Sequence, residues 1–554
     1  MLVLNREHEH NVRVNIATLQ SVWGVPLQVA PSEQALSRLA LESGLQGVQF
    51  RVQTDAGRWV VVHGRQPAED ALTWWKERVS GAGGTTGAVV MIGAGLGYGV
   101  AAALADAAAV AVLVIEHDPA RAQALLAARD WRPWIEQRRF AVLVGPDYVG
   151  RSDIAAQLFS GATKPLVLAH PVLQRAYPTD ALASARVAKA LVSEARHNQT
   201  AHSVFAERYL LNTLSNLGNI LASRRVSELT GLGTGQAAIV AGAGPSLNRN
   251  IVELLPFRDR AIIIAAGSAV RPLREAGIEA DVNVALDPAD LTARNLAGTE
   301  TGTRAVLVAE GSVPAEVFRQ FRSRTFAFRV GENHPWPWLA GLGIDPGCLR
   351  AWGSVITSAF DLAVRLGCNP IVLVGADHSY TGGQPYCRQT TWEGDWRYWE
   401  AHGIPIAEIW RTWKARQPLV MVTDVHGDPV ESATHLLAYR DWLVEASIRA
   451  APVRVVNATG AGILMGGRIA SETISEALAG CATATGLGSR VSRVGQRAWP
   501  VSVDRVGLAT QVTCGAAGRS VADVWQNDVP GFDLDRALAA LESGLGLGSM
   551  GHTA

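Results

Sequence analysis

The chain has 554 residues, and 50 Lys and Arg balance 50 Asp and Glu, so its formal net charge is zero. A protein that follows nucleic-acid phosphates over a broad surface usually carries a basic excess, so the composition argues against that class. Hydrophobic residues make up 48% of the chain and charged residues 18%, which allows a large core and excludes wholesale disorder. At about 150 residues per domain, the length predicts three or four domains.

The five cysteines form no CxxC pair, which argues against a disulfide framework or a zinc ribbon. The first residues mix acids, His and Arg without an apolar run, so no signal peptide is visible. The most apolar stretch, residues 107–115, is too short to span a bilayer and is typical of a buried strand. We therefore expect a cytoplasmic α/β protein without a membrane segment.

The N-terminal part of the chain predicts a hairpin followed by an α/β unit. Residues 49–52 and 58–62 have strand periodicity around a turn. Apolar strands and helices then alternate, which is typical of a parallel sheet. The elements predicted there are strands 88–92, 112–115 and 140–144, a glycine loop with an Ala-rich helix, and a helix over 119–129. We assign residues 1–180 to this Rossmann-like N-terminal domain.

From about residue 180 the pattern changes to long helical segments, and residues 181–235 predict a helical connector. A second α/β array, the central domain, covers residues 236–480, and residues 481–554 predict a C-terminal helical region with a helix over 533–543 and a Gly-rich tail. The strands predicted in the central domain are 237–240, 262–265, 282–286, 305–309, 325–329, 371–374 and 453–456. The fold class is thus α/β, with two Rossmann-like parallel-sheet units, a helical connector and a small, mainly helical C-terminal region.

The first glycine loop, residues 93–99, follows a predicted strand. Glu116 ends the next strand, 116 − 93 = 23 residues after the first glycine, and Asp118 follows it. This spacing suits a Rossmann-type site, in which the glycines admit a ligand and an acid accepts hydrogen bonds from a ribose. The alternative is that the glycines only permit tight packing of strand and helix.

The second glycine loop contains Gly242, Gly244, Pro245 and Ser246. The glycines free the backbone to bend, and Pro245 sets φ at the entrance of a helix, where its missing N–H costs nothing. Ser246 caps the helix or presents its hydroxyl. Exposed N–H groups and the helix dipole would favour a phosphate here. The alternative is a rigid turn with a serine cap.

Polar residues also follow other predicted strands of the central domain. Ser268, Asp287 and the segment Asp377, His378 and Tyr380 each come directly after one. The carboxyl ends of parallel strands lie at one edge of a sheet, where ligands bind. We therefore expect these residues to converge with the second glycine loop.

Five segments of the central domain resemble, in order, the motility accessory factor family. These are bacterial flagellin glycosyltransferases that attach nonulosonic (sialic-like) acids, the class of pseudaminic acid. The segments are GAGPSL, IIIAAGSAVRPLREAGIEADVNVALDP, GSVITSAFDLAVRLGCNPIVLVGADHSYTG, DPVESATHLLAYRDWL and VRVVNATGAG. The resemblance covers about residues 237–470, and more loosely the N-terminal and helical regions. It implies transfer of a nonulosonic acid from a CMP-activated donor to Ser or Thr of flagellin, for flagellum assembly and motility.

The same stretch is similar to bacterial sialyltransferases that act on lipooligosaccharides. In that family a Gly-x-Gly-Pro-Ser loop lies at the CMP phosphate, and a histidine is the proposed general base. The matching segments imply nucleotide-binding roles for Gly242, Gly244, Pro245, Ser246, Ser268, Ser354 and Val355, and catalytic roles for Asp377 and His426. From their places after predicted strands we add Asp287 and Tyr380 as nucleotide-binding candidates and His378 as a catalytic candidate.

The identity of the general base stays open. His426 begins a His-Gly-Asp-Pro-Val-Glu stretch before a predicted amphipathic helix, but the flagellin family commonly has a glycine-rich segment at that place. His378 and a nearby carboxylate such as Asp424 are the alternatives. A base with a pKa near neutrality would take the proton from the acceptor hydroxyl.

The resemblance also implies how the phosphate is held and which partners are present. The glycine loop and helix N-terminus would stabilise the phosphate as CMP leaves, with Tyr380 or Ser354 donating further hydrogen bonds. We expect no metal, and no cofactor beyond the CMP-activated sugar as donor substrate. The expected partners are flagellin and the CMP-nonulosonic acid donor, without nucleic acid or membrane.

Three other interpretations remain. An archaeal branch with a similar central domain is associated with pyrophosphokinase action on 6-hydroxymethylpterin, which would use ATP and Mg²⁺ held by Asp287 and Asp377. A working first glycine loop would make the protein an S-adenosylmethionine or dinucleotide enzyme. The third is a non-catalytic flagellin-binding protein with an empty nucleotide pocket.

Tryptophans crowd into one short segment of the central domain. Trp392, Trp396 and Trp399 have the spacing of one helical face, and Trp410 and Trp413 follow. Core packing is one interpretation, and an aromatic wall that receives a sugar or a flagellin segment is the other. Residues 334–338, with two more tryptophans, have the same two interpretations.

Overall fold

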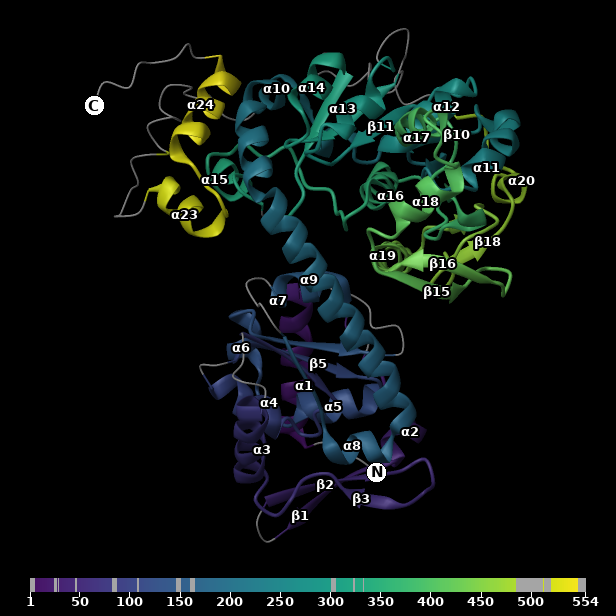
Figure 1. Ribbon diagram of the computed structural model, residues 1–554. Helices are drawn as coiled ribbons and strands as arrows, with labels where there is room; N and C mark the ends of the chain where they lie inside the picture. Colours follow the sequence, from purple (N-terminus) through teal and green to yellow (C-terminus); the bar gives the residue numbers. More distant parts are fainter. Residues whose placement is uncertain are drawn as a thin grey trace. The chain divides into compact units, whose positions relative to one another are not determined.

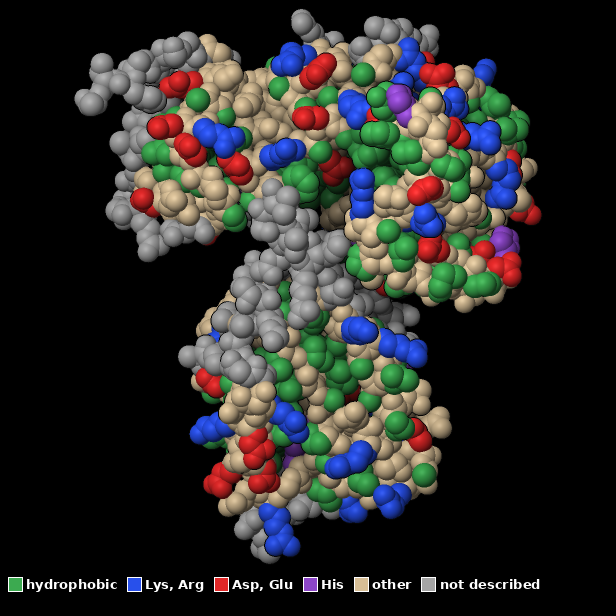
Figure 2. Space-filling view, in the orientation of Figure 1, with side chains coloured by type: hydrophobic (Ala, Val, Ile, Leu, Met, Phe, Trp, Pro, Cys, Tyr) green, Lys and Arg blue, Asp and Glu red, His purple; other side chains and the backbone are tan. Residues whose placement is uncertain are grey.

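The computed structural model describes residues 5–23, 27, 29–44, 47–81, 87–106, 109–145, 151–159, 165–299, 305–321, 324–331, 333–484, 512 and 520–546. The chain is mixed α/β and divides into two compact units, unit 1 (Met1–Gln199) and unit 2 (Thr200–Ala554). Figure 1 labels helices and strands of both units. Every helix of the described part is too short or too polar to cross a bilayer. Figure 2 shows basic and acidic side chains interspersed over the viewed face, in keeping with the zero net charge.

Unit 1 contains a parallel sheet of four strands in the order β6-β5-β4-β7. The predicted strands are confirmed as β4 (Gly87–Ile92), β5 (Ala109–Glu116) and β6 (Phe140–Val144), and β7 (Leu166–Ala169) was not predicted. Residues 107 and 108 of the apolar stretch lie outside the described residues. The helices of the unit are α1 (Arg6–Trp23), α3 (Pro67–Gly81), α4 (Tyr98–Ala105), α5 (Pro119–Ala127), α6 (Arg132–Glu136) and α7 (Arg151–Leu158).

The predicted hairpin of unit 1 is confirmed, with one strand more than expected. β2 (Gly47–Gln53) pairs antiparallel with β3 (Trp59–Val61), and β1 (Leu39–Gly44) pairs with the other edge of β2. The short helix α2 (Glu33–Ser37) precedes this sheet. Phe50 and Val52 of β2 are buried in a small core with Tyr177.

The predicted connector is helical over most of its length. After α8 (Pro171–Ala176), the chain forms α9 (Pro178–Ser215) and α10 (Leu217–Ala222). The connector is not helical as far as residue 235, because β8 (Arg224–Arg225) pairs with β13 and forms one edge of the sheet in unit 2. A strand of two residues carries no periodicity that a sequence pattern can reveal.

Unit 2 is built on a parallel sheet of nine strands in the order β18-β17-β14-β9-β10-β11-β12-β13-β8. All strands predicted for the central domain are present, and the two terminal strands of this sheet, β18 and β8, were not expected. Their bounds are β9 (Ala237–Ala241), β10 (Ala261–Ala266), β11 (Val282–Ala285), β12 (Val306–Glu310), β13 (Thr325–Phe328), β14 (Ile371–Val374), β17 (Val455–Asn457) and β18 (Ile469–Ser471).

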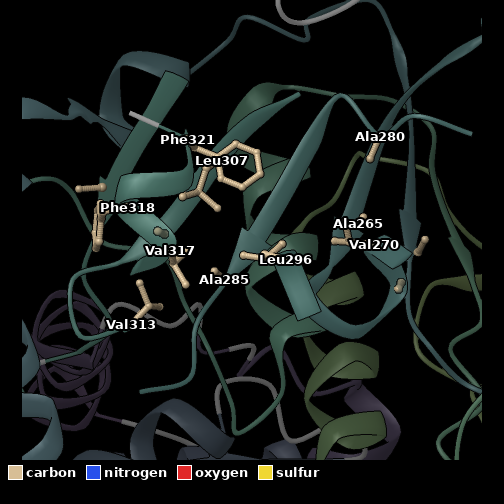
Figure 3. Packing of buried hydrophobic residues seen from close by; sticks show 14 of the residues in the cluster. Ala265, Val270, Ala280, Ala285, Leu296, Leu307, Val313, Val317, Phe318 and Phe321 are labelled. Carbon is tan, nitrogen blue, oxygen red and sulfur yellow. The ribbon is translucent and has the colours of Figure 1, made fainter. Parts of the chain in front are cut away.

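Alternate residues of these strands enter two different cores, one on each face of the sheet. Ile239 and Leu307 belong to the first core, and Val240 and Val308 to the second. Figure 3 shows the first core, where Leu307 lies beside Phe321. The helices of unit 2 include α11 (Leu247–Leu254), α12 (Val270–Glu275), α13 (Leu291–Leu296), α14 (Ala315–Phe321), α15 (Trp336–Gly341), α16 (Val355–Leu366), α19 (Thr434–Arg449) and α20 (Ile474–Ala477).

The C-terminal helices pack into the first core of unit 2. The predicted helix 533–543 is confirmed as α24 (Leu534–Leu545), and α23 (Val521–Asp528) precedes it. Trp525 of α23 is buried against Trp338, and a Cβ atom at Gly544 would lie 2.1 Å from the carbonyl oxygen of Leu214. The described C-terminal region is therefore part of this core, while Cys514 and the Gly-rich tail lie outside the described residues.

An insertion between β14 and α19 completes unit 2. It consists of α17 (Thr391–Ala401), α18 (Ile406–Lys414) and a two-stranded antiparallel hairpin, β15 (Leu419–Thr423) and β16 (Pro429–Ala433). The sequence pattern predicted a helical face for the tryptophans but not this hairpin.

Candidate functional site

The strand order of unit 2 reverses beside β9, since β10 lies on one side of it and β14 on the other. In an open parallel sheet, ligands bind at the carboxyl ends of the strands where the order reverses. The loops that follow β9 and β14 lie together at this point. A Cβ atom at Gly242 would lie 2.7 Å from the carbonyl oxygen of Gly375, and one at Gly244 would lie 2.1 Å from Asp377 Oδ2. A side chain at either position would clash with the other loop, so this close packing of the two loops requires glycine at both positions.

Asp377 joins these loops through the start of α11. Its carboxylate accepts hydrogen bonds from the backbone N–H of Ser246, at 3.3 Å, and from the Ser246 hydroxyl. Only 1% of Asp377 is exposed, and burial raises the pKa of its carboxyl even though Ser246 stabilises the charge. A carboxylate of the protein therefore occupies the place at this helix end where an anion would bind.

Most donors of the second glycine loop are already bonded within the protein. Besides the donors of Ser246, the N–H of Gly242 is bonded to the carbonyl of Val374, and that of Gly244 to the carbonyl of Gly375. Pro245 has no N–H. Ser246 does not cap its helix, unlike the serine cap of the alternative interpretation, and phosphate binding at this loop stays a prediction.

Free donors are found instead at the start of α16. Ser354 is extended, with φ −143° and ψ 140°, and its side chain makes no capping hydrogen bond. Among the described residues, no group accepts from the N–H groups of Gly353, Ser354, Val355 and Ile356. Ile356 Cδ1 lies 2.9 Å from the Cβ position of Gly242, so this helix end reaches the glycine loop. Free N–H groups at a helix N-terminus favour an anion.

Tyrosine side chains lie around this helix end. The Oη of Tyr439 on α19 is 3.2 Å from the Cβ position of Gly353. Tyr380 is buried, and its hydroxyl has no partner among the described residues. Burial raises the pKa of Tyr380 to about 12, and that of Tyr386 to about 12 as well. These phenols stay protonated at neutral pH and are available as hydrogen-bond donors.

Asp287, two residues after the end of β11, differs from Asp377 in its exposure and in its hydrogen bonds. It is exposed to solvent, and no hydrogen bond to its carboxyl is found among the described residues. The surrounding protein nevertheless desolvates it and raises its pKa to about 6. Its charge also contributes to the raised pKa values of Tyr386 and Tyr439, after burial. Asp287 therefore lies near these tyrosines, beyond the carboxyl end of β11.

The predicted bases lie in different surroundings. His426 is exposed on the turn of the β15–β16 hairpin, where its Nε2 lies 3.1 Å from the carbonyl oxygen of Gly460. His378 is buried, has a φ of 51°, and has its pKa lowered to about 3 by burial and by Arg440. A histidine with that pKa is a weak base at neutral pH. The roles of these histidines remain predictions.

Two further predicted residues have local partners. Ser268, at the end of β10, accepts a hydrogen bond from Asn295 Nδ2 at 3.2 Å. Val355 packs beside Gly267, with Cγ2 3.7 Å from that residue's Cβ position. Sequence reasoning missed Gly353, Tyr386 and Tyr439, because no local pattern places them beside α16.

The tryptophan segment is partly core, as one interpretation expected, and the role of an aromatic wall for a sugar or a flagellin segment stays a prediction. Trp396 is buried and packs against Tyr386 and Trp413, at ring-centroid distances of 6.5 and 6.3 Å. Trp399, in contrast, is 51% exposed. The aromatic cluster thus packs around the ring of Tyr386. In residues 334–338, Trp336 is a core residue whose Nε1 donates to Glu310 at 3.0 Å.

The first glycine loop, in unit 1, is covered by protein. A Cβ atom at Gly95 would lie 2.5 Å from His63 Nε2, which accepts the N–H of Leu96 at 2.9 Å. Burial and His170 lower the pKa of His63 to about 3, so it is neutral. A neutral histidine therefore lies where a Rossmann site would hold its phosphates.

The acids expected to bind a ribose in unit 1 have other partners. Glu116 accepts from Arg121 Nε at 2.8 Å, and Asp118 caps α5 by accepting the N–H of Ala120 at 2.8 Å. A cavity of about 250 Å³, counted with its open mouth, lies beside Gly93 and Glu116. A Cβ atom at Gly97 would lie 2.6 Å from Trp131, which agrees with the packing interpretation.

Among the described residues, no group of three or more His, Cys, Asp or Glu side chains lies close enough together to hold a metal ion.

One comparison with known protein families matches a segment that contains most residues of the candidate site. A family model described as MptE-like, 6-hydroxymethylpterin diphosphokinase MptE-like, matches residues 211–383. This segment is less than half of the chain, and it contains both loops, Asp287 and the start of α16. No curated protein matches the chain significantly.

Among solved structures, the chain is similar to one titled "Structure of MAf glycosyltransferase from Magnetospirillum magneticum AMB-1". The two share 15% sequence identity with a TM-score of 0.45, over 97% of this chain and 86% of that chain. A likeness of this size carries no conclusion about activity.

Proposed function

We propose that unit 2 is a glycosyltransferase that moves a nonulosonic acid from a CMP-activated donor to Ser or Thr of flagellin. The choice of donor and acceptor rests on the sequence resemblance. The observation that carries the nucleotide site is the group of free N–H donors from Gly353 to Ile356, at the sheet edge where the strand order reverses. These donors, with the hydroxyls of Tyr380 and Tyr439, suit the phosphate of a nucleotide.

In this proposal the start of α16 stabilises the departing phosphate. The bond between the anomeric carbon and the phosphate oxygen breaks, and its electron pair leaves with CMP. Backbone N–H groups that are already in place stabilise this charge without reorganisation. The phenols of Tyr380 and Tyr439 donate further hydrogen bonds, because both remain protonated at neutral pH.

Asp287 is the proposed general base. As the acceptor oxygen bonds to the anomeric carbon, its proton passes to a carboxylate oxygen of Asp287. A base is most effective when its pKa lies near the working pH, and the pKa of Asp287 is raised to about 6. We prefer Asp287 to Asp377, which is bonded to Ser246, and to His378, whose pKa is about 3.

The second candidate is a Mg²⁺-dependent diphosphokinase acting on 6-hydroxymethylpterin. The family model over residues 211–383 favours it. ATP phosphates would use the same donors of α16, and Asp287 would hold the metal ion. Asp377 is a poor second ligand, since its carboxylate already accepts two donors of Ser246.

Calorimetry with CMP and with ATP, each in EDTA and in Mg²⁺, tests the two functions. We expect metal-independent binding of CMP. Val355 is the first residue of α16, and Ser354 before it is extended, so proline fits there and removes one free N–H. Val355→Pro should weaken CMP binding about tenfold or more, which is the effect of a lost hydrogen bond to a charged group.

Val355→Ala is the matched control, because it shortens the side chain but keeps the N–H. It should bind CMP as the unmodified protein does. Binding of ATP only with Mg²⁺, and none of CMP, would favour the diphosphokinase. CMP binding that Val355→Pro leaves unchanged would place the nucleotide away from α16.

A further inference from the structure

The hydrogen bonds of the β15–β16 hairpin define which way each peptide group of β15 points. Met421 lies opposite Glu431 in the hairpin. The carbonyl of Glu431 points away from β15, because it accepts the N–H of Tyr380 at 2.8 Å. The pair of Met421 and Glu431 is therefore one of the pairs that exchange no hydrogen bonds. The bond from the Asp424 N–H to the Asp428 carbonyl, at 2.8 Å, fits this alternation.

It follows that Leu419, Met421 and Thr423 direct their N–H and C=O groups away from β16. The hairpin has two strands, and within the described residues no group bonds to this outer edge of β15. The side chains of the same residues are also exposed, Met421 by 67% and Leu419 by 38%. An open strand edge with exposed apolar side chains is a template for pairing with another strand.

The order of charges along the hairpin favours one occupant for this edge. Arg416 is exposed just before β15, and Asp424 and Asp428 lie in the turn after it. If β15 pairs with itself around a two-fold axis at Met421, Leu419 lies opposite Thr423 of the other copy. Arg416 then lies opposite His426 of the other copy, in the turn that also carries both acids. An edge with this order is self-complementary, as a two-fold interface requires.

We propose that β15 pairs antiparallel with β15 of a second copy of this chain, forming one continuous antiparallel sheet from two hairpins. Each pair that faces across the new edge exchanges both N–H···O bonds. The paired strands are short, so the dimer forms reversibly with concentration. The inference is independent of the proposed function. The pairing also restricts the motion of β16, in which the carbonyl of Glu431 accepts the N–H of Tyr380.

Sedimentation velocity of the full chain over a concentration series tests this pairing. We expect a monomer–dimer equilibrium for the unmodified protein. In Met421→Lys two lysines face each other across the axis, and like charges directly opposite destabilise a strand pair. The dimer dissociation constant should rise by about tenfold or more. Met421→Pro should act in the same way, because the lost N–H points away from β16 and the hairpin keeps its own bonds.

Val252→Lys is the matched control, since Val252 on α11 is also 67% exposed and apolar. It should leave the dissociation constant unchanged. Thermal unfolding of each variant checks that the fold is kept. A chain that remains monomeric throughout the series would overturn the proposal, and so would a dimer that Met421→Lys and Met421→Pro leave intact.

Discussion

Two carboxylates at the same sheet edge differ in what their surroundings allow them to do. Asp377 is buried and uses its oxygens to hold the start of α11. Asp287 is exposed, its carboxyl has no hydrogen-bond partner among the described residues, and its pKa is raised to about 6. The first is suited to a structural role, and the second to accepting a proton.

Asp287→Asn should abolish transfer to flagellin while the protein still binds CMP. In the unmodified enzyme the rate should rise with pH through about 6, because the base acts only when deprotonated. Mass spectrometry of flagellin incubated with a CMP-nonulosonic acid measures the transfer. A variant that transfers at the normal rate would exclude Asp287 as the base.

The same substitution has an expected effect on stability. The raised pKa means that folding favours the protonated form of Asp287, so its contribution to stability is lost as pH rises through about 6. Asn has no charge to desolvate, and Asp287→Asn should therefore unfold at a higher temperature than the unmodified protein at pH 8. At pH 4 the difference should be small.

Asp377→Ala should destabilise unit 2 by about 1–3 kcal/mol, because it leaves the buried donors of Ser246 without an acceptor. Urea unfolding measures the loss. Asp377→Asn keeps an acceptor oxygen and should cost less. In a Ser246→Ala background Asp377→Ala should cost less than it does alone, because the hydroxyl contact is already absent. Full additivity of the two losses would contradict a direct contact.

At the scale of elements, the glycine loop of each unit is packed against a different side chain. His63 from the chain after β3 lies over the loop that follows β4, and Asp377 from the loop after β14 lies over the one that follows β9. Each loop therefore has its place for an anion filled by protein. In unit 2 the free donors belong to another element, α16.

Arg121 of α5 joins three elements of unit 1. It lies 2.8 Å from Glu116 at the end of β5, 3.5 Å from Asp118, and 2.6 Å from Asp180 of α9, and it is 3% exposed. Its guanidinium also stacks over the ring of Tyr177 at 4.1 Å. The start of α9 is thus attached to the sheet of unit 1 through one buried cation.

Arg121→Leu should destabilise unit 1 by about 3–5 kcal/mol at neutral pH, because it leaves the buried carboxylate of Glu116 without its cation. The loss should be smaller at pH 5, since burial already raises the pKa of Glu116 and protonation removes the unpaired charge. Urea unfolding at both pH values measures this. Arg132→Leu, which removes an exposed pair with Asp130, is the control and should change stability little. An equal loss at both pH values would contradict the prediction.

At the scale of the whole molecule, the strand order of unit 2 brings together residues far apart in sequence. Ser246 and Asp377 are 131 positions apart, and they meet only because β14 pairs with β9. Gly353 and Tyr439 come from the start of α16 and from α19, on the same face of the sheet. The candidate site is a property of this arrangement.

Most strands of the two parallel sheets and the long helices could be predicted from the sequence by itself, because apolar runs and helical periodicity are local and these strands are buried on both faces. The order of the strands was beyond such prediction, as were the attachment of β8 and the C-terminal helices to unit 2 and the covering of both glycine loops. A local pattern shows that a donor or carboxylate exists. Which group satisfies it, and which is left free for a ligand, depends on register and packing between distant segments, and these only the tertiary structure decides.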